Sequence, residues 1–260
     1  MTGRLEQHLR ARRDTGQKLL IPYVTGGLTD DWSAAVEASV AAGADAVEVG
    51  IPFSDPVMDG PTIQEASDRA LASGTTPVSV LAGIRQLEVE APLAVMTYYN
   101  LAFKNGLERF AAGLQDAGVS AAILPDLPLE EVEPWARAAD EAGIETVLLA
   151  APTAPDSRLP AIVARSRGFV YGVGLVGITG ERDELAATAL DMARRLKEIT
   201  DKPVLVGVGV SNPEQAAEVA EVADGVIVGS ALIRKILDSG SIEPAVEFVA
   251  ELRTGLDAVS

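Results

Sequence analysis

Residues 46–61 read AVEVGIPFSDPVMDGP, an apolar strand that holds one carboxylate and ends in a proline-rich loop. The valines and the isoleucine that alternate along this strand are typical of a strand buried on both faces. Glu48 shares its face with the small residues Ala46 and Gly50, which leaves room beside the carboxylate. A helix-forming run, residues 62–73, follows the loop. The stretch therefore predicts one strand-loop-helix unit of an α/β fold.

Glu48 is a candidate catalytic residue, because a carboxylate in apolar surroundings loses hydration. That loss raises the pKa of a carboxyl group toward the range that suits proton transfer near neutral pH. A second carboxylate, Asp59, follows in the loop, which Pro56 and Pro61 stiffen. A structural alternative is open at this point: a buried Glu can also be the partner of a structural Arg or Lys.

The same rhythm, a short apolar run and then an amphipathic helix-forming segment, recurs along the whole chain. We expect strands at residues 18–24, 46–51, 93–98, 121–125, 145–150, 168–173, 203–208 and 225–228. Several intervening helices end in an Ala-Gly pair, where glycine can adopt the left-handed cap before the next strand. Asn212, followed by a proline and by Gln215, is typical of a helix N-cap with a capping box.

Strands that alternate with helices pair in parallel through right-handed crossovers. Either a closed barrel or an open doubly wound sheet could result. The number of repeats, and the lack of a Gly-x-Gly-x-x-Gly turn in the first crossover, favour the barrel. We therefore predict a single-domain (β/α)8 TIM barrel over residues 1–260, with an extra N-terminal helix within residues 1–14.

Composition excludes several classes of function. A chain of 260 residues with 48% hydrophobic content suits one large α/β domain. The absence of Cys and the single His, His8, argue against thiol chemistry, disulfides and a metal site, so carboxylates must carry any acid–base work. The net charge of −17 argues against a nucleic-acid partner. No apolar run reaches the ~18 residues of a membrane span and no targeting peptide is evident, so we expect a cytoplasmic protein.

Glycine-rich turns late in the chain favour a phosphate site. They lie at residues 177–180, 207–209 and 229–230, and the loops after the seventh and eighth strands are the usual phosphate position in such barrels. Glycine lets backbone N–H groups approach phosphate oxygens. Ser230 is expected to cap a helix over residues 231–237 and to donate its hydroxyl. Taken singly, each glycine pair is more often just a tight turn, but their joint placement favours the phosphate site.

The stretch after Glu48 closely resembles the signature of the tryptophan synthase alpha subunit family. The match covers Glu48, the PFSDP loop at residues 52–56 and the DGPTIQ run at residues 59–64. The resemblance implies that the chain cleaves indole-3-glycerol phosphate into indole and glyceraldehyde 3-phosphate. It implies that Glu48 moves the protons, and that Asp59 binds the indole N–H. It also implies no cofactor in this chain, because the pyridoxal phosphate of the family belongs to the beta subunit.

The resemblance assigns the other site residues as well. It places the phosphate and the pocket wall at Tyr23, Tyr98, Tyr171, Thr179, Gly180, Gly207, Gly209, Gly229 and Ser230. Core packing is an equal interpretation for Tyr23, and Thr179 would bond Asp59 when the loop closes. Contact with a beta subunit, in an α2β2 heterotetramer, is expected at Asp55, Asn100 and Asp126. Asp126 could equally be the N-cap of a helix that starts near Glu130.

The loop after the sixth predicted strand departs from the family pattern. Gly174 stands where the family commonly has Ser, and Leu175 and Val176 are apolar. We therefore expect weaker loop closure and weaker communication with a partner. Three other functions stay open: a free-standing lyase that releases indole, an isomerase-type phosphate-binding barrel enzyme, and a non-catalytic barrel that activates a beta subunit.

Overall fold

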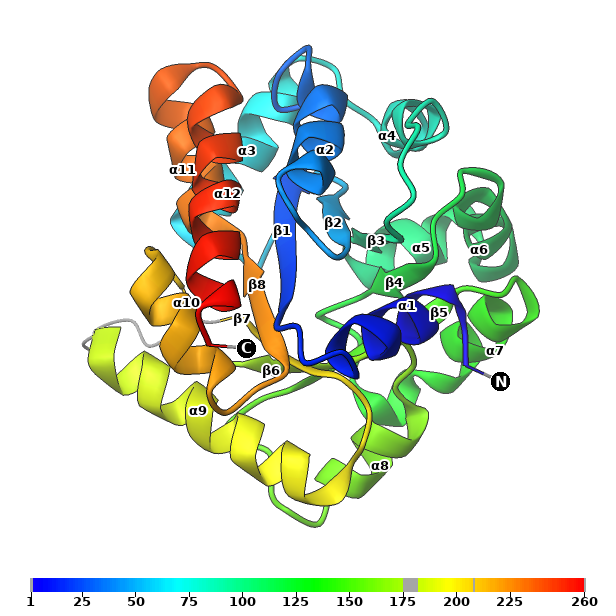
Figure 1. Cartoon of the computed structure of the whole chain (residues 1–260). Coiled ribbons are helices and arrows are strands. Elements are labelled where there is room, and N and C mark those ends of the chain that lie inside the picture. Colours follow the sequence, from blue (N-terminus) through cyan, green and yellow to red (C-terminus); the bar gives the residue numbers. More distant parts are fainter. Residues whose placement is uncertain (1, 175–181, 208, 260) are drawn as a thin grey trace.

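The computed structural model describes residues 2–174, 182–207 and 209–259 (Figure 1). Its strands form a closed barrel in chain order, and every neighbouring pair is parallel. The strands are β1 (Leu19–Thr25), β2 (Val47–Gly50), β3 (Leu93–Met96), β4 (Ala121–Ile123), β5 (Glu145–Ala150), β6 (Val170–Val173), β7 (Val204–Gly207) and β8 (Gly225–Val228). The predicted (β/α)8 barrel is confirmed, and the pairing of β8 with β1 rules out the open sheet.

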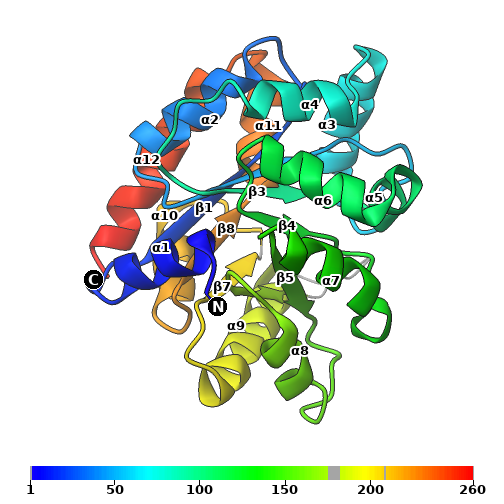
Figure 2. The same cartoon turned by 90° about the vertical axis from the view of Figure 1, so that its right-hand side faces the viewer.

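Helices surround the strands (Figure 2). They are α1 (Arg4–Arg13), α2 (Trp32–Ala41), α3 (Pro61–Ala72), α4 (Pro77–Ile84), α5 (Tyr99–Asn105), α6 (Leu107–Asp116), the 3-10 turn η1 (Leu129–Glu131), α7 (Glu133–Glu141), α8 (Leu159–Arg165), α9 (Arg182–Ile199), α10 (Pro213–Ala220), α11 (Ser230–Ser239) and α12 (Glu243–Asp257). The expected N-terminal helix is α1, and the helix expected after the Asp59 loop is α3.

The core has two layers, because side chains alternate between the two faces of each strand. The outer layer fills the space between the strands and the helices. The inner layer fills the barrel itself with Leu19, Ile21, Ala46, Ala94, Ala121, Ile123, Val147, Phe169, Leu205 and Ile227. Leu5 and Leu9 of α1 belong to this inner layer and are fully buried. Helix α1 therefore closes the end of the barrel where the strands begin.

Buried carboxylates hold this closure in place. Glu145, the first residue of β5, accepts the backbone N–H groups of Leu5 (2.6 Å) and Glu6 (3.0 Å), which lie in the first turn of α1. Asp45 accepts the Arg12 Nε–H (3.0 Å) and the Leu20 backbone N–H (2.8 Å). Because the first N–H groups of a helix lack partners within the helix, Glu145 acts as their cap from another element. A ligand must therefore enter from the opposite end.

Two predicted helix starts had different outcomes. The Asn212 cap is confirmed, since its side chain accepts the Gln215 backbone N–H at 2.8 Å. The Gln215 side chain accepts a hydrogen bond from the backbone N–H of Ser211 (2.9 Å). In a capping box it would instead accept the backbone N–H of the N-cap residue itself, Asn212. The predicted Ser230 cap is wrong, because α11 begins at Ser230 itself, with Gly229 as the N-cap and no side-chain cap bond.

Candidate active site

Glu48 points into the barrel from the middle of β2. It pairs in register with Tyr23 of β1 and Ala94 of β3. The residue is 1% exposed, and its Oε2 has no hydrogen-bond partner within the described ranges. The described residues also contain no ion pair to Glu48, so the structural Arg or Lys partner that the sequence left open is not found there. Burial, together with the charge of Asp59, raises the pKa of Glu48 to about 8.

Asp59 lies at the end of the loop that follows β2, and it is partly buried. Burial raises the pKa of its carboxyl group to about 6, while the neighbouring Tyr98 hydroxyl acts in the opposite direction. The two carboxyl groups therefore differ near neutral pH: Glu48 carries a proton and Asp59 is mostly ionised. Such a division is typical of sites in which one carboxyl moves protons and the other stabilises positive charge.

Tyr98 connects the loop of Asp59 to the next strand. Its hydroxyl accepts the backbone N–H of Met58 at 2.9 Å. Its ring stacks on Phe53, with 5.1 Å between the ring centroids. From the sequence we expected Tyr98 in the pocket wall and expected no role for Phe53. An aromatic residue set between two prolines is the signal that could have marked Phe53 as an anchor of this loop.

Tyr23 and Tyr171 each lie against a glycine of the next strand. A Cβ on Gly207 would stand 2.6 Å from the Tyr171 hydroxyl, and one on Gly50 would collide with the Tyr23 hydroxyl. Gly50 and Gly207 therefore make room for the tyrosine rings. Burial raises the pKa of both tyrosines, so both phenols keep their protons and can donate hydrogen bonds.

The glycines expected to bind phosphate are only partly within the described ranges. Thr179 and Gly180 lie outside them. Gly209 has a φ of +56°, a left-handed conformation that favours glycine. Gly229 and Ser230 stand at the N-terminus of α11, whose first backbone N–H groups have no partner within the helix. The adjacent strands β7 and β8 bring these two turns to neighbouring positions.

The residues expected to contact a partner are exposed, two on loops and one on helix α5. Asp55 accepts a hydrogen bond from the Ser54 hydroxyl (2.6 Å), and Asn100 is exposed on α5. Asp126 accepts the backbone N–H of Tyr99 at 2.8 Å, at the start of α5. The alternative role of Asp126 as a cap near Glu130 is therefore wrong, since η1 follows Pro128 without a side-chain cap.

Large apolar side chains are exposed on the loop that follows β2 and on α5. Val57, Met58 and Phe103 are 79%, 51% and 60% exposed. From the sequence we expected no role for any of them, although the Val-Met pair in an otherwise polar loop was a signal. Exposed apolar side chains that share a face with polar contact residues are typical of a protein interface.

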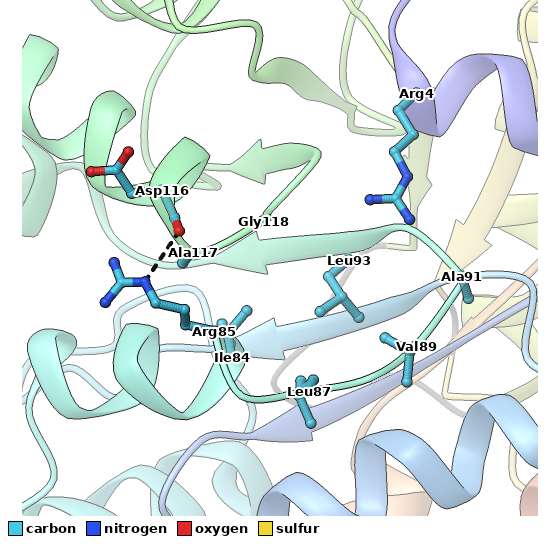
Figure 3. A pocket seen from close by; sticks show the side chains of 10 residues that line it. All are labelled: Arg4, Ile84, Arg85, Leu87, Val89, Ala91, Leu93, Asp116, Ala117 and Gly118. Carbon is cyan, nitrogen blue, oxygen red and sulfur yellow. Dashed lines mark hydrogen bonds between the residues drawn. The ribbon is translucent and has the colours of Figure 1, made fainter.

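A cavity of about 240 Å³ lies at the other end of the barrel (Figure 3). It is lined by Arg4, Ile84, Arg85, Leu87, Val89, Ala91, Leu93, Asp116, Ala117 and Gly118. Both arginines already donate to backbone carbonyls, Arg4 to Glu90 (2.8 Å) and Arg85 to Asp116 (3.1 Å). This cavity contains neither Glu48 nor Asp59, so we do not assign the chemistry to it.

The described ranges offer neither a metal site nor a membrane-spanning helix. They contain no group of three or more His, Cys, Asp or Glu side chains that could hold a metal ion. None of their helices is both long enough and apolar enough to cross a membrane.

A parallel (β/α)8 barrel is typical of a TIM-barrel enzyme when it buries a carboxyl group that has no ion-pair partner within the described ranges and holds a second carboxyl group in an adjoining loop. Residues 9–257 match the family model described as Tryptophan synthase alpha chain. The chain belongs to the tryptophan synthase alpha chain family. This result confirms the resemblance found in the sequence and removes the isomerase alternative.

Individual relatives agree with the family match. The tryptophan synthase alpha chain of Thermobifida fusca is 46% identical, over 98% of this chain and 98% of the relative. That of Streptomyces coelicolor is 45% identical, over 97% and 94%. A crystal structure of tryptophan synthase from M. tuberculosis has a TM-score of 0.89 and 36% identity, over 98% of this chain and 99% of that chain. The alpha chain of Legionella pneumophila has a TM-score of 0.89 and 33% identity, over 100% and 99%.

Proposed function

We propose that Glu48 and Asp59 carry out the alpha reaction of tryptophan synthase, in which indole-3-glycerol phosphate is cleaved into indole and glyceraldehyde 3-phosphate. Family membership makes the chain a lyase of tryptophan biosynthesis. One observation carries the residue assignment: Glu48 is a fully buried carboxyl group, one of its oxygens has no partner within the described ranges, and Asp59 is close enough to raise its pKa. An unpartnered buried polar atom is costly unless it serves a ligand.

Glu48 has the proton affinity that the cleavage requires. The retro-aldol reaction needs a proton on indole C3 and the loss of a proton from the neighbouring side-chain hydroxyl. With a pKa of about 8, Glu48 is protonated at neutral pH and can donate to C3. The resulting carboxylate then accepts the hydroxyl proton as the carbon–carbon bond breaks. Glu48 thus returns to its protonated form within one turnover.

Asp59 supplies a negative charge that balances the positive charge formed on the indole ring. Protonation of C3 makes the indole ring cationic, and an ionised carboxylate that accepts the indole N–H stabilises this intermediate. The pKa of about 6 leaves Asp59 mostly ionised at neutral pH. The rings of Tyr23, Tyr98 and Tyr171 form the wall that receives the indole.

The phosphate group is assigned to the turns after β7 and β8. Gly209, Gly229 and Ser230 offer backbone N–H groups and one hydroxyl, and the N-terminus of α11 favours an anion. Gly180 and Thr179 complete this set in the family resemblance. Gly207 supports it indirectly, because it provides the space for Tyr171.

The partner of this chain is a beta subunit, as family membership implies. We assign to it an α2β2 assembly in which the beta subunit holds pyridoxal phosphate, while this chain needs no cofactor. The contact face would combine Asp55, Asn100 and Asp126 with the exposed apolar side chains beside them. Docking there would order the Asp59 loop and exclude water from the site.

One assay tests this function. Cleavage of indole-3-glycerol phosphate is measured with and without the beta subunit of the same organism. Cleavage that rises on addition of the beta subunit supports the synthase. Brisk cleavage that ignores the beta subunit supports the free-standing lyase, which the apolar residues after Gly174 favour. An absence of cleavage, combined with activation of the beta subunit, would identify a non-catalytic barrel.

A further inference from the structure

We infer that Tyr98 is a positioning residue that fixes the loop of residues 52–59 and directs the Asp59 carboxylate into the site. The inference rests on the proposed function, because it gives Asp59 its orientation for the cationic intermediate. It assigns Tyr98 a task beyond that of a pocket wall.

The geometry carries this inference. Tyr98 follows β3, the loop follows β2, and Gly50 pairs with Met96 where the two strands end. The Tyr98 ring stacks on Phe53 at the beginning of the loop, with 26° between the ring planes. Its hydroxyl accepts the Met58 N–H at 2.9 Å, near the end of the loop. One buried side chain, 5% exposed, therefore contacts the loop at both ends.

The rest of this loop has few other attachments. Its hydrogen bonds within the described ranges are mostly local, such as Val57 N–H to the Asp55 carbonyl (2.9 Å) and Asp59 N–H to the Pro56 carbonyl (3.1 Å). Val57 is 79% exposed and packs against little. Gln64 adds a bond to the Asp59 carbonyl (2.8 Å), but it comes from the helix that continues the same segment. Within the described ranges, Tyr98 is thus the principal link to this loop from another segment of the barrel.

The hydroxyl of Tyr98 can serve both contacts at once. A phenol has one proton to donate and lone pairs to accept, so it can accept the Met58 N–H while it donates to Asp59. A hydrogen bond that the phenol donates to a carboxylate also restricts the direction in which that carboxylate points.

The electrostatic surroundings make this bond important. The groups that face Asp59 are Glu48 from β2, Tyr23 from β1 and Tyr171 from β6, and Asp126 acts on Tyr98 from the loop after β4. None of these is a cation. Within the described ranges, the Tyr98 hydroxyl is the group that lowers the pKa of Asp59 against the effect of burial. Its loss would disfavour the ionised form that the reaction uses.

The test compares Tyr98→Phe with Tyr99→Phe, a neighbouring tyrosine whose ring packs on Phe103. Phenylalanine keeps the stacking on Phe53 and removes only the hydroxyl. We expect Tyr98→Phe to lower kcat for indole-3-glycerol phosphate cleavage about tenfold, with a smaller change in KM, and to move the acidic limb of the pH–rate profile upward. We expect Tyr99→Phe to leave both unchanged.

A double mutant separates positioning from general support of the structure. In an Asp59→Asn background, Tyr98→Phe should cost less than about threefold, because its target carboxylate is gone. A tenfold loss that persists in this background would overturn the inference, and so would a kcat of Tyr98→Phe equal to that of the wild type.

A readout without turnover keeps this inference distinct from the proposed function. We would titrate the carboxyl 13C resonance of Asp59 in the wild type and in Tyr98→Phe. This resonance is assigned by its disappearance from the spectrum of Asp59→Asn. We expect the pKa of Asp59 to rise by about one pH unit in the variant, a tenfold change in its ionisation constant. An unchanged pKa overturns the role of Tyr98. A wild-type chain that fails to cleave the substrate instead overturns the proposed function, while this titration still decides the inference.

Discussion

Replacement of Glu48 by Gln is expected to abolish cleavage and to stabilise the fold at the same time. Gln keeps the volume of the side chain and removes the proton that both transfer steps use. General acid–base catalysis by one group contributes roughly 10² to 10⁴ in rate, and Glu48 serves in two steps, so we expect a loss of at least about a thousandfold in kcat. Substrate affinity should change little, because the shape of the pocket is retained.

The effect on stability follows from the raised pKa of Glu48. Its carboxyl group titrates at 4.5 when unperturbed and at about 8 in the barrel. A folded pKa above the unfolded one means that the folded state holds the proton more tightly. The contribution of Glu48 to the free energy of unfolding is therefore fully present below pH 4.5, and it falls as the pH rises toward 8. At 1.36 kcal/mol per pH unit, the loss over this window is at most about 5 kcal/mol.

Urea unfolding at pH 5 and pH 8 measures how the free energy of unfolding depends on pH. Cleavage is measured separately, by coupling the released glyceraldehyde 3-phosphate to its dehydrogenase. The free energy of unfolding of Glu48→Gln should exceed that of the wild type by more at pH 8 than at pH 5. Glu247→Gln is the matched control, since Glu247 is exposed on α12. Near-wild-type turnover in Glu48→Gln would refute the mechanism. A gain in stability that does not depend on pH would refute the raised pKa.

Three further outcomes are expected. Asp59→Asn should lower kcat about a hundredfold, less than Glu48→Gln, because it removes an electrostatic stabiliser and leaves the proton carrier; a larger loss than in Glu48→Gln would reverse the two roles. Gly229→Asp should weaken binding of glycerol phosphate far more than it lowers the melting temperature, and equal wild-type affinities for a phosphorylated ligand and its dephosphorylated analogue would argue against a phosphate site. Titration with the beta subunit should raise the cleavage rate, and Asp55→Ala should blunt this response; a flat titration would support the free-standing lyase.

Local sequence determined the elements and their order. A strand buried on both faces needs a continuous apolar run, and the run at residues 225–228 is found as β8 with the same bounds. The Asn212 cap was equally readable, because its hydrogen bond spans only three residues. The carboxylate in the second strand was visible as a polar residue within an apolar run. These features depend on near neighbours, so the sequence alone carries them.

The tertiary structure decided what each carboxylate and tyrosine does. In the sequence Glu145 is only the start of a predicted strand, yet its side chain caps α1. The backbone N–H groups that it accepts lie 140 and 139 residues earlier in the chain. The Tyr98 bond to Met58 spans 40 residues and depends on β2 and β3 being neighbours in the barrel. Within the described ranges, Glu48 Oε2 has no hydrogen-bond partner, and only the assembled barrel could show this. Desolvation and long-range hydrogen bonds depend on the closed barrel, because they arise only when distant segments meet.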